Sequence, residues 1–166
     1  MTTTTPIKTI ALSPGSHLLI PNVTWEQYED LLEDGTLELM SPLPDHERPH
    51  RIISDVIKLL LDAQGREWED FGSTTFKKLK QAGLEPDTCF YIQNASRVRD
   101  LLRMDMTQDP PPDLAIEADV TSKTTLEAYA ALQVPEVWIY DHNKLKIHLL
   151  QNGEYQESDV SLTFPE

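Results

Sequence analysis

Short apolar runs typical of β-strands alternate along most of this chain with segments of helical periodicity. The clearest helix covers His50–Ala63, where apolar residues recur every three to four positions. Further helices are expected after Thr24, over Ala95–Leu102 and from Thr124 to about Leu132. The expected strands are Thr36–Ser41, Thr74–Leu79, Cys89–Ile92, Leu114–Val120, Glu136–Tyr140, Leu145–Leu150 and Gly153–Gln156. This order predicts an α/β (α+β) fold with a central mixed β-sheet flanked by helices.

The length of 166 residues suits one domain with a hydrophobic core and is short for two. We expect a polar tail and lead-in segment at residues 1–22 and a single domain at residues 23–166. The single cysteine, Cys89, permits no internal disulfide and is expected to be a buried thiol. That cysteine usage fits a reducing compartment, so we expect a cytoplasmic protein. No apolar run is long enough for a transmembrane span.

The charge of the chain limits its partners. The 28 acidic residues outnumber the 14 basic ones and give a net charge of −14 at pH 7, which argues against a passive nucleic-acid-binding module. The window 76–103 is different, because its six basic and three acidic residues give a net charge of +3. The window indicates either a local basic stripe or an ordinary solvated strand edge and helix face.

Three acidic residues occupy expected strand positions. Glu38 lies in the middle of TLELM, Asp87 lies just before CFYI with one residue between, and Glu117 lies inside LAIEADV. A carboxylate among apolar neighbours must be paired, hydrogen-bonded or bound to a metal, because burying an isolated charge is very unfavourable. Three carboxylates from separate segments can converge on a hard cation such as Mg²⁺. The alternative is that Glu38 and Glu117 lie on the solvent face of an edge strand.

Two basic residues complete this set. Lys123 follows Glu117 by six residues, at the expected strand-to-helix turn, where an amine can polarise a water or stabilise charge on a phosphate. His50 opens the long helix and could point its ring at the acidic cluster. The segment HERPH at 46–50 also matches the H-E-x-x-H pattern of zinc peptidases. We expect Pro49 to lie in the first helical turn, so that the motif begins before the helix is regular, which makes a zinc peptidase the least favoured alternative.

Taken together, three segments resemble the Uma-type family of "putative restriction endonucleases", a domain of unknown function within the PD-(D/E)XK nuclease superfamily. The resemblance extends from about Val23 to Tyr155, and the segments are TWEQYEDLLEDGTLELMSPLPDHERPHRII, EPDTCFYI and PPPDLAIEADVTSKTTLEAYAALQVPEVWIYD. It implies a restriction-endonuclease-like fold and a Mg²⁺-dependent endonuclease that hydrolyses the phosphodiester bonds of DNA. Mn²⁺ would be an alternative ion, and a homodimer would be a usual assembly.

The resemblance also implies roles for single residues. Asp87 and Glu117 would hold the metal, Glu38 would assist, and His50 would match the histidine that opens the first long helix. The catalytic lysine departs from the family pattern, because Asp119 stands where a strict E-x-K would have lysine and Thr125 stands where many relatives carry one. Lys123 is then the candidate. These departures support an alternative, a catalytically degenerate nuclease-fold protein that acts through protein–protein interaction.

Overall fold

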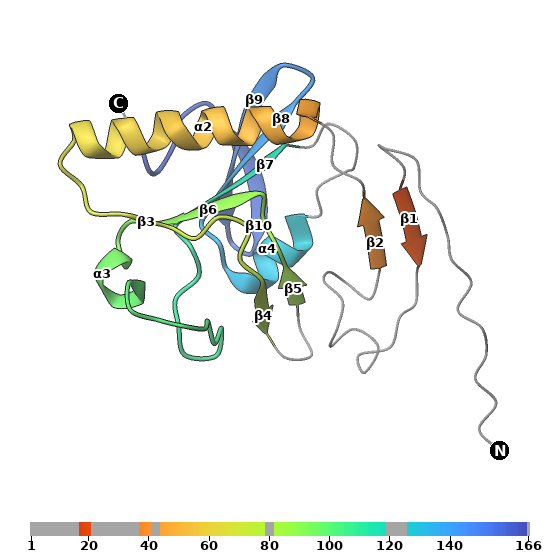
Figure 1. Cartoon of the computed structure of the whole chain (residues 1–166), viewed down its shortest axis with the longest axis horizontal. Coiled ribbons are helices and arrows are strands. Elements are labelled where there is room, and N and C mark those ends of the chain that lie inside the picture. The colour runs from red at the N-terminus through yellow and green to blue at the C-terminus, as the bar shows by residue number, and fades with distance from the viewer. Residues whose placement is uncertain (1–16, 21–36, 41–43, 79–81, 119–125, 166) are drawn as a thin grey trace.

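A six-stranded sheet lies at the centre of the computed structural model, which describes residues 17–20, 37–40, 44–78, 82–118 and 126–165 (Figure 1). The strand order is β10-β9-β8-β7-β6-β3, and within this sheet β7 and β8 are parallel while the other neighbours run antiparallel. The strands are β3 (Glu69–Asp70), β6 (Thr88–Tyr91), β7 (Leu114–Ala118), β8 (Glu136–Asp141), β9 (Lys144–Gln151) and β10 (Glu154–Ser158). The predicted mixed sheet is confirmed.

Helices cover the two faces of the sheet (Figure 1). Successive strand residues point to opposite faces, so each strand contributes to two clusters. On one face, α2 (Pro44–Ala63) packs Ile57 and Leu61 against sheet residues Phe90, Leu114, Ile116 and Trp138. On the other face, α4 (Leu126–Leu132) and the hairpin of β4 (Phe76–Lys78) and β5 (Ala82–Leu84) pack against Cys89, Ala115, Val137 and Ile139. Cys89 is buried, as expected.

Two tight turns shape the β8–β9–β10 meander. His142 and Asn143 connect the first pair with φ angles of 47° and 62°, and Asn152 and Gly153 connect the second pair with φ angles of 53° and 86°. Two-residue loops with both residues in the left-handed region match the right-handed twist of antiparallel strands. The hairpin and edge strand expected after Glu136 are therefore confirmed. Among the described residues, no helix is both long and apolar enough to cross a membrane.

Some boundaries differ from the sequence-based expectations. Helix α2 begins at Pro44, so Pro49 lies inside it and residues 46–50 are helical, contrary to our expectation. Pro49 removes the N–H that would reach the carbonyl of residue 45, and its ring crowds that carbonyl, so it disfavours the helix at this point by about 3 kcal/mol. Helix α3 (Ala95–Val98) ends earlier than predicted, where the N–H of Leu101 bonds to the Val98 carbonyl in a tight turn.

The N-terminal part contains a separate two-stranded ribbon. Strand β1 (His17–Ile20) pairs antiparallel with β2 (Leu37–Met40), so a strand lies within the expected lead-in segment. The ribbon lies beyond the end of the core at which α2 begins (Figure 1). The helix expected after Thr24 lies outside the described residues.

An ion pair connects α2 to the edge of the sheet. Lys58 Nζ lies 2.6 Å from Asp70 Oδ2 on β3. Asp70 also accepts hydrogen bonds from the Gly72 N–H at 2.8 Å and the Thr88 hydroxyl at 3.0 Å. Burial raises the pKa of Asp70, but Lys58 and these hydrogen bonds outweigh it and hold the pKa below the ordinary value of 3.8.

The lowered pKa of Asp70 predicts an acid-sensitive contribution to stability. Since the folded value lies below the unfolded one, the contribution is complete above the unfolded pKa and is lost as the pH falls through the folded pKa. We expect the free energy of unfolding of the wild type to fall more steeply below about pH 4 than that of Asp70→Asn. Urea unfolding at a series of pH values tests this, and parallel curves for the two proteins would contradict it.

Candidate active site

Two acidic residues meet at one end of the β6–β7 pair. Thr88 lies opposite Ile116 in the antiparallel register, so continuing that register by one residue sets Asp87 opposite Glu117. Asp87 Oδ2 accepts a hydrogen bond of 2.7 Å from the backbone N–H of Ala118, the residue after Glu117. The pairing of two distant segments therefore sets Asp87 and Glu117 side by side along the backbone at this end of the strands.

The local sequence explains why Asp87 stands at the strand entrance. Pro86 is buried and has no N–H to donate to a neighbouring strand, so regular pairing begins after it, at Thr88. Asp87 is the last residue before that pairing, and its carboxylate bonds to the adjacent strand. The Pro-Asp sequence thus positions a carboxylate at the point where the pairing of β6 with β7 begins.

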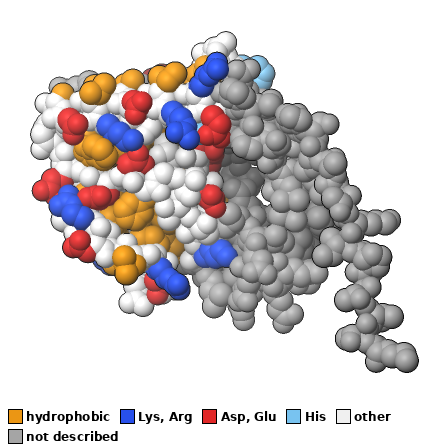
Figure 2. Space-filling model, in the orientation of Figure 1, with side chains coloured by type: hydrophobic (Ala, Val, Ile, Leu, Met, Phe, Trp, Pro, Cys, Tyr) orange, Lys and Arg blue, Asp and Glu red, His pale blue; other side chains and the backbone are white. Residues whose placement is uncertain are grey.

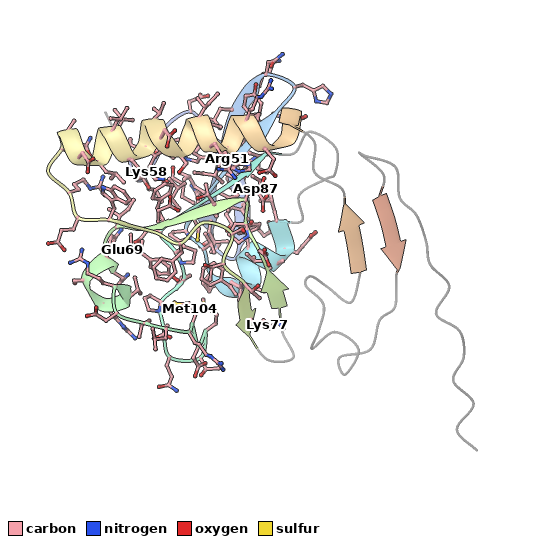
Figure 3. All side chains as sticks on the ribbon, in the orientation of Figure 1. Arg51, Lys58, Glu69, Lys77, Asp87 and Met104 are labelled. Carbon is pink, nitrogen blue, oxygen red and sulfur yellow. The ribbon has the colours of Figure 1, made fainter. Side chains whose placement is uncertain are left out.

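The ring of His50 lies beside this pair. His50 belongs to the second turn of α2 and is buried, with 7% exposed. Its Nδ1 lies 3.9 Å from Asp87 Oδ2, and its Nε2 lies 3.8 Å from Glu47 Oε2. Figure 3 shows Asp87 close to the N-terminal half of α2, near Arg51. Of the three predicted acidic residues, Asp87 is thus the one that the structure places near the His50 ring.

A tyrosine from the opposite helix contacts the second carboxylate. The Tyr129 hydroxyl donates a very short hydrogen bond to Glu117 Oε1. Tyr129 is 1% exposed and packs in the hydrophobic cluster between α4 and the sheet. The sequence reasoning missed the hydroxyl contact, because helical spacing shows which face is buried but not which polar group on another strand it meets.

Other predicted site residues are only partly placed by the structure. Glu38 lies in β2 opposite Leu19, but the structure does not describe its side chain. Lys123 and Asp119 lie outside the described residues. In the part of the chain that is described, no group of three or more His, Cys, Asp or Glu residues could hold a metal ion. The structure does not describe the side chain of His46, so this search does not test the H-E-x-x-H segment as a zinc site.

Two arginines of the basic window 76–103 do not line the site. Arg99 pairs with Glu69 at 2.5 Å and with Glu67 at 3.5 Å, and Glu69 lies opposite Tyr91, at the other end of β6 from Asp87 (Figure 3). Arg97 donates to the Gln108 carbonyl at 2.5 Å. Arg97 and Arg99 are thus engaged within the protein at the other end of β6 from Asp87, because α3 follows that end of the strand.

The carboxylate pair has the donor chemistry that a magnesium site needs. Both side chains offer oxygen ligands, which Mg²⁺ and Mn²⁺ prefer. The hydrogen bonds from the Ala118 N–H and the Tyr129 hydroxyl each use one acceptor position and orient the carboxylates. Mg²⁺ is commonly held by one or two carboxylates, with waters and substrate phosphate completing its coordination. Asp87 and Glu117 therefore fit such an ion.

Comparison with solved structures identifies the class of fold. A chain described as a putative nuclease belonging to DUF820, from Anabaena variabilis, matches with a TM-score of 0.57 and 17% sequence identity. The match covers 82% of this chain and 84% of that chain, so the two share a fold. The Uma2 family, described as "Putative restriction endonuclease", matches residues 19–166, and the chain belongs to this family. Membership supports a nuclease role. No curated protein matches the sequence.

Proposed function

We propose that this protein is a Mg²⁺-dependent DNA endonuclease in which Asp87 and Glu117 hold the ion and Glu38 assists. The observation that carries the proposal is the meeting of Asp87 and Glu117 at the end of β6 and β7, with the Asp87 carboxylate bonded to the backbone beside Glu117. Membership in a restriction endonuclease family supports the reaction class. Mn²⁺ is expected to replace Mg²⁺, since both accept carboxylate oxygens.

The contacts of each residue support the role that we propose for it. When bound, the metal would neutralise charge on the phosphoryl oxygens and activate a water. The Ala118 N–H and His50 hold Asp87 in place, and Tyr129 holds Glu117. We assign to Lys123 the stabilisation of charge that develops on the phosphate or the polarisation of the attacking water. His50 orients Asp87 or contacts the scissile phosphate.

Electrostatics predict that DNA binding depends on the metal. The net charge of −14 disfavours approach of a polyanion, and Arg97 and Arg99 of the basic window are engaged elsewhere. A bound divalent cation reverses the local field at a carboxylate site. DNA affinity should therefore be weak in EDTA.

The decisive experiment is a cleavage assay with the purified full chain. Supercoiled plasmid and a single-stranded DNA circle are each incubated with Mg²⁺, with Mn²⁺ and with EDTA, and Lys123→Met is assayed in parallel. We expect nicking with either metal, none in EDTA, and strongly reduced nicking by the lysine variant. Mn²⁺ binding measured by calorimetry without cleavage of either substrate would reject the endonuclease and favour the degenerate, protein-binding alternative.

The Tyr129 hydroxyl supplies a finer prediction. Tyr129→Phe keeps the buried ring but removes the donor that orients Glu117, so we expect an approximately 10- to 100-fold lower cleavage rate or metal affinity, as is typical of residues behind a metal ligand. Tyr155→Phe is the matched control, because its hydroxyl donates to the Val134 carbonyl instead. Equal rates for the two variants in a Mg²⁺ titration would contradict a role for Tyr129 at the site.

A further inference from the structure

Arg51 lies on the exposed border of α2, next to the candidate active site. Its side chain is 74% exposed, and it directly follows His50, whose Nδ1 lies 3.9 Å from Asp87 Oδ2. Successive residues of a helix point roughly 100° apart, so the neighbour of a buried residue can reach the surface at the same edge. Figure 3 shows Arg51 near Asp87, with Lys58 farther along the helix. Arg51 is therefore a cation at the margin of the carboxylate site.

The contacts of Arg51 leave its guanidinium able to bind another anion. Its Nη2 lies 3.7 Å from Glu47 Oε2, and the same oxygen lies 3.8 Å from His50 Nε2. A separation of 3.7 Å is longer than a hydrogen bond, and water screens an ion pair between exposed side chains. The guanidinium presents its N–H donors as a planar fork that matches two oxygens of a phosphate. Arg51 can thus exchange Glu47 for a phosphate with little loss.

Lys58 lies seven residues farther along the same side of α2 and shows the contrast. Its Nζ is 2.6 Å from Asp70 Oδ2 and its side chain is only 31% exposed, so it is held within the protein. Figure 2 shows Lys and Arg side chains interspersed with Asp and Glu on the visible face that α2 crosses. A DNA backbone that approaches such a face needs cations that can leave their acidic partners. Arg51 meets this need better than Lys58.

We propose that Arg51 binds a backbone phosphate of the DNA, next to the scissile one. This inference rests on the proposed function, since it assumes that DNA is cleaved at Asp87 and Glu117. The contacts that lead from Asp87 to Arg51 pass through the His50 ring and the Glu47 carboxylate, so the guanidinium is set back from the metal ligands. Arg51 therefore holds and orients the substrate without a preference for sequence, as phosphate contacts do.

DNA binding at a series of salt concentrations tests this role. The affinity for a labelled duplex is measured by fluorescence anisotropy with Ca²⁺ in place of Mg²⁺, and a gel verifies that the duplex stays intact. We expect Arg51→Gln to weaken binding about five- to tenfold and to lower the slope of log affinity against log salt by about one. Arg103→Gln is the matched control, because Arg103 is exposed in the loop after α3, at the other end of β6 from Asp87. Equal affinities and equal salt slopes for the two variants would overturn the proposal.

Glu47→Gln separates a phosphate contact from a merely structural ion pair. Both Glu47→Gln and Arg51→Gln break the pair between these two side chains, so a structural role predicts the same effect on DNA binding. A phosphate contact predicts opposite effects, because Glu47→Gln removes a negative charge beside the phosphate and releases the arginine to it. We expect tighter binding by Glu47→Gln, and weaker binding by both variants would overturn the proposal.

Two further measurements distinguish this inference from the proposed function. Arg51→Gln should bind Mn²⁺ at least as tightly as the wild type in calorimetry, because the change removes a cation near the metal ligands. Weaker Mn²⁺ binding would place the defect at the carboxylates and overturn the phosphate contact. Metal-dependent nicking by the wild type, together with wild-type DNA affinity of Arg51→Gln, would overturn the contact alone. A wild type that neither nicks nor binds DNA would reject the endonuclease and this contact with it.

Discussion

Asp87→Asn and Glu117→Gln are each expected to lower metal-dependent DNA cleavage by at least about 100-fold while the protein stays folded. Each change replaces a charged oxygen ligand with a neutral amide, which binds a divalent cation much more weakly. The asparagine keeps an oxygen that can accept the Ala118 N–H, and the glutamine keeps one for the Tyr129 hydroxyl. The loss should therefore come from the missing charge at the site. Nicking rates of supercoiled plasmid at saturating Mg²⁺ measure the effect.

The control for this pair is a carboxylate away from the site. Glu157 is exposed on the edge strand β10, and Glu157→Gln should cleave like the wild type. Calorimetric titration with Mn²⁺ adds a measurement that does not depend on turnover, and both site variants should bind the ion more weakly. Cleavage that persists in both variants at the wild-type rate would indicate a contaminating nuclease or a different active site.

Glu136→Ala is expected to lower the free energy of unfolding by about 3–5 kcal/mol, the largest stability effect of a single change that we predict. Glu136 is fully buried in β8 and accepts three hydrogen bonds. The donors are Trp138 Nε1 at 2.7 Å, the Thr163 N–H at 2.9 Å and the Thr163 hydroxyl at 2.8 Å. Removing the carboxylate leaves these buried donors without an acceptor and detaches the C-terminal segment from the sheet.

Thr163→Val is the graded comparison for this stability prediction. It removes the hydroxyl donor but keeps the backbone N–H and the side-chain volume, so we expect a loss of about 1 kcal/mol. Urea unfolding followed by far-UV circular dichroism measures both variants without relying on the fluorescence of Trp138, whose environment changes directly. If the Glu136→Ala variant unfolds at the wild-type urea midpoint, the carboxylate network does not stabilise the fold.

Several residues of the candidate site could be identified from the sequence, because they are polar residues next to or within regular apolar patterns. Asp87 lies one residue before an apolar run and Glu117 lies within one, so each stood out as a carboxylate that needs a partner. His50 was recognisable at a helix because the following apolar periodicity is regular. Lys123 and the side chain of Glu38 lie outside the described part of the chain, so their roles remain predictions. The contact of the Tyr129 hydroxyl could not be predicted from the sequence, because the helical position of Tyr129 indicates only that its side chain is buried.

The sequence by itself determined the nature of the main elements. The buried strands β6, β7 and β8, the amphipathic α2 and the β8–β9 hairpin all follow from local periodicity and turn chemistry, which act over a few neighbouring residues. Only the tertiary structure decided how these elements meet. The β6–β7 register that opposes Asp87 and Glu117, and the Glu136 contacts with Thr163, join residues that are 27 to 31 positions apart. Such pairings depend on packing across the whole core, which no local pattern encodes.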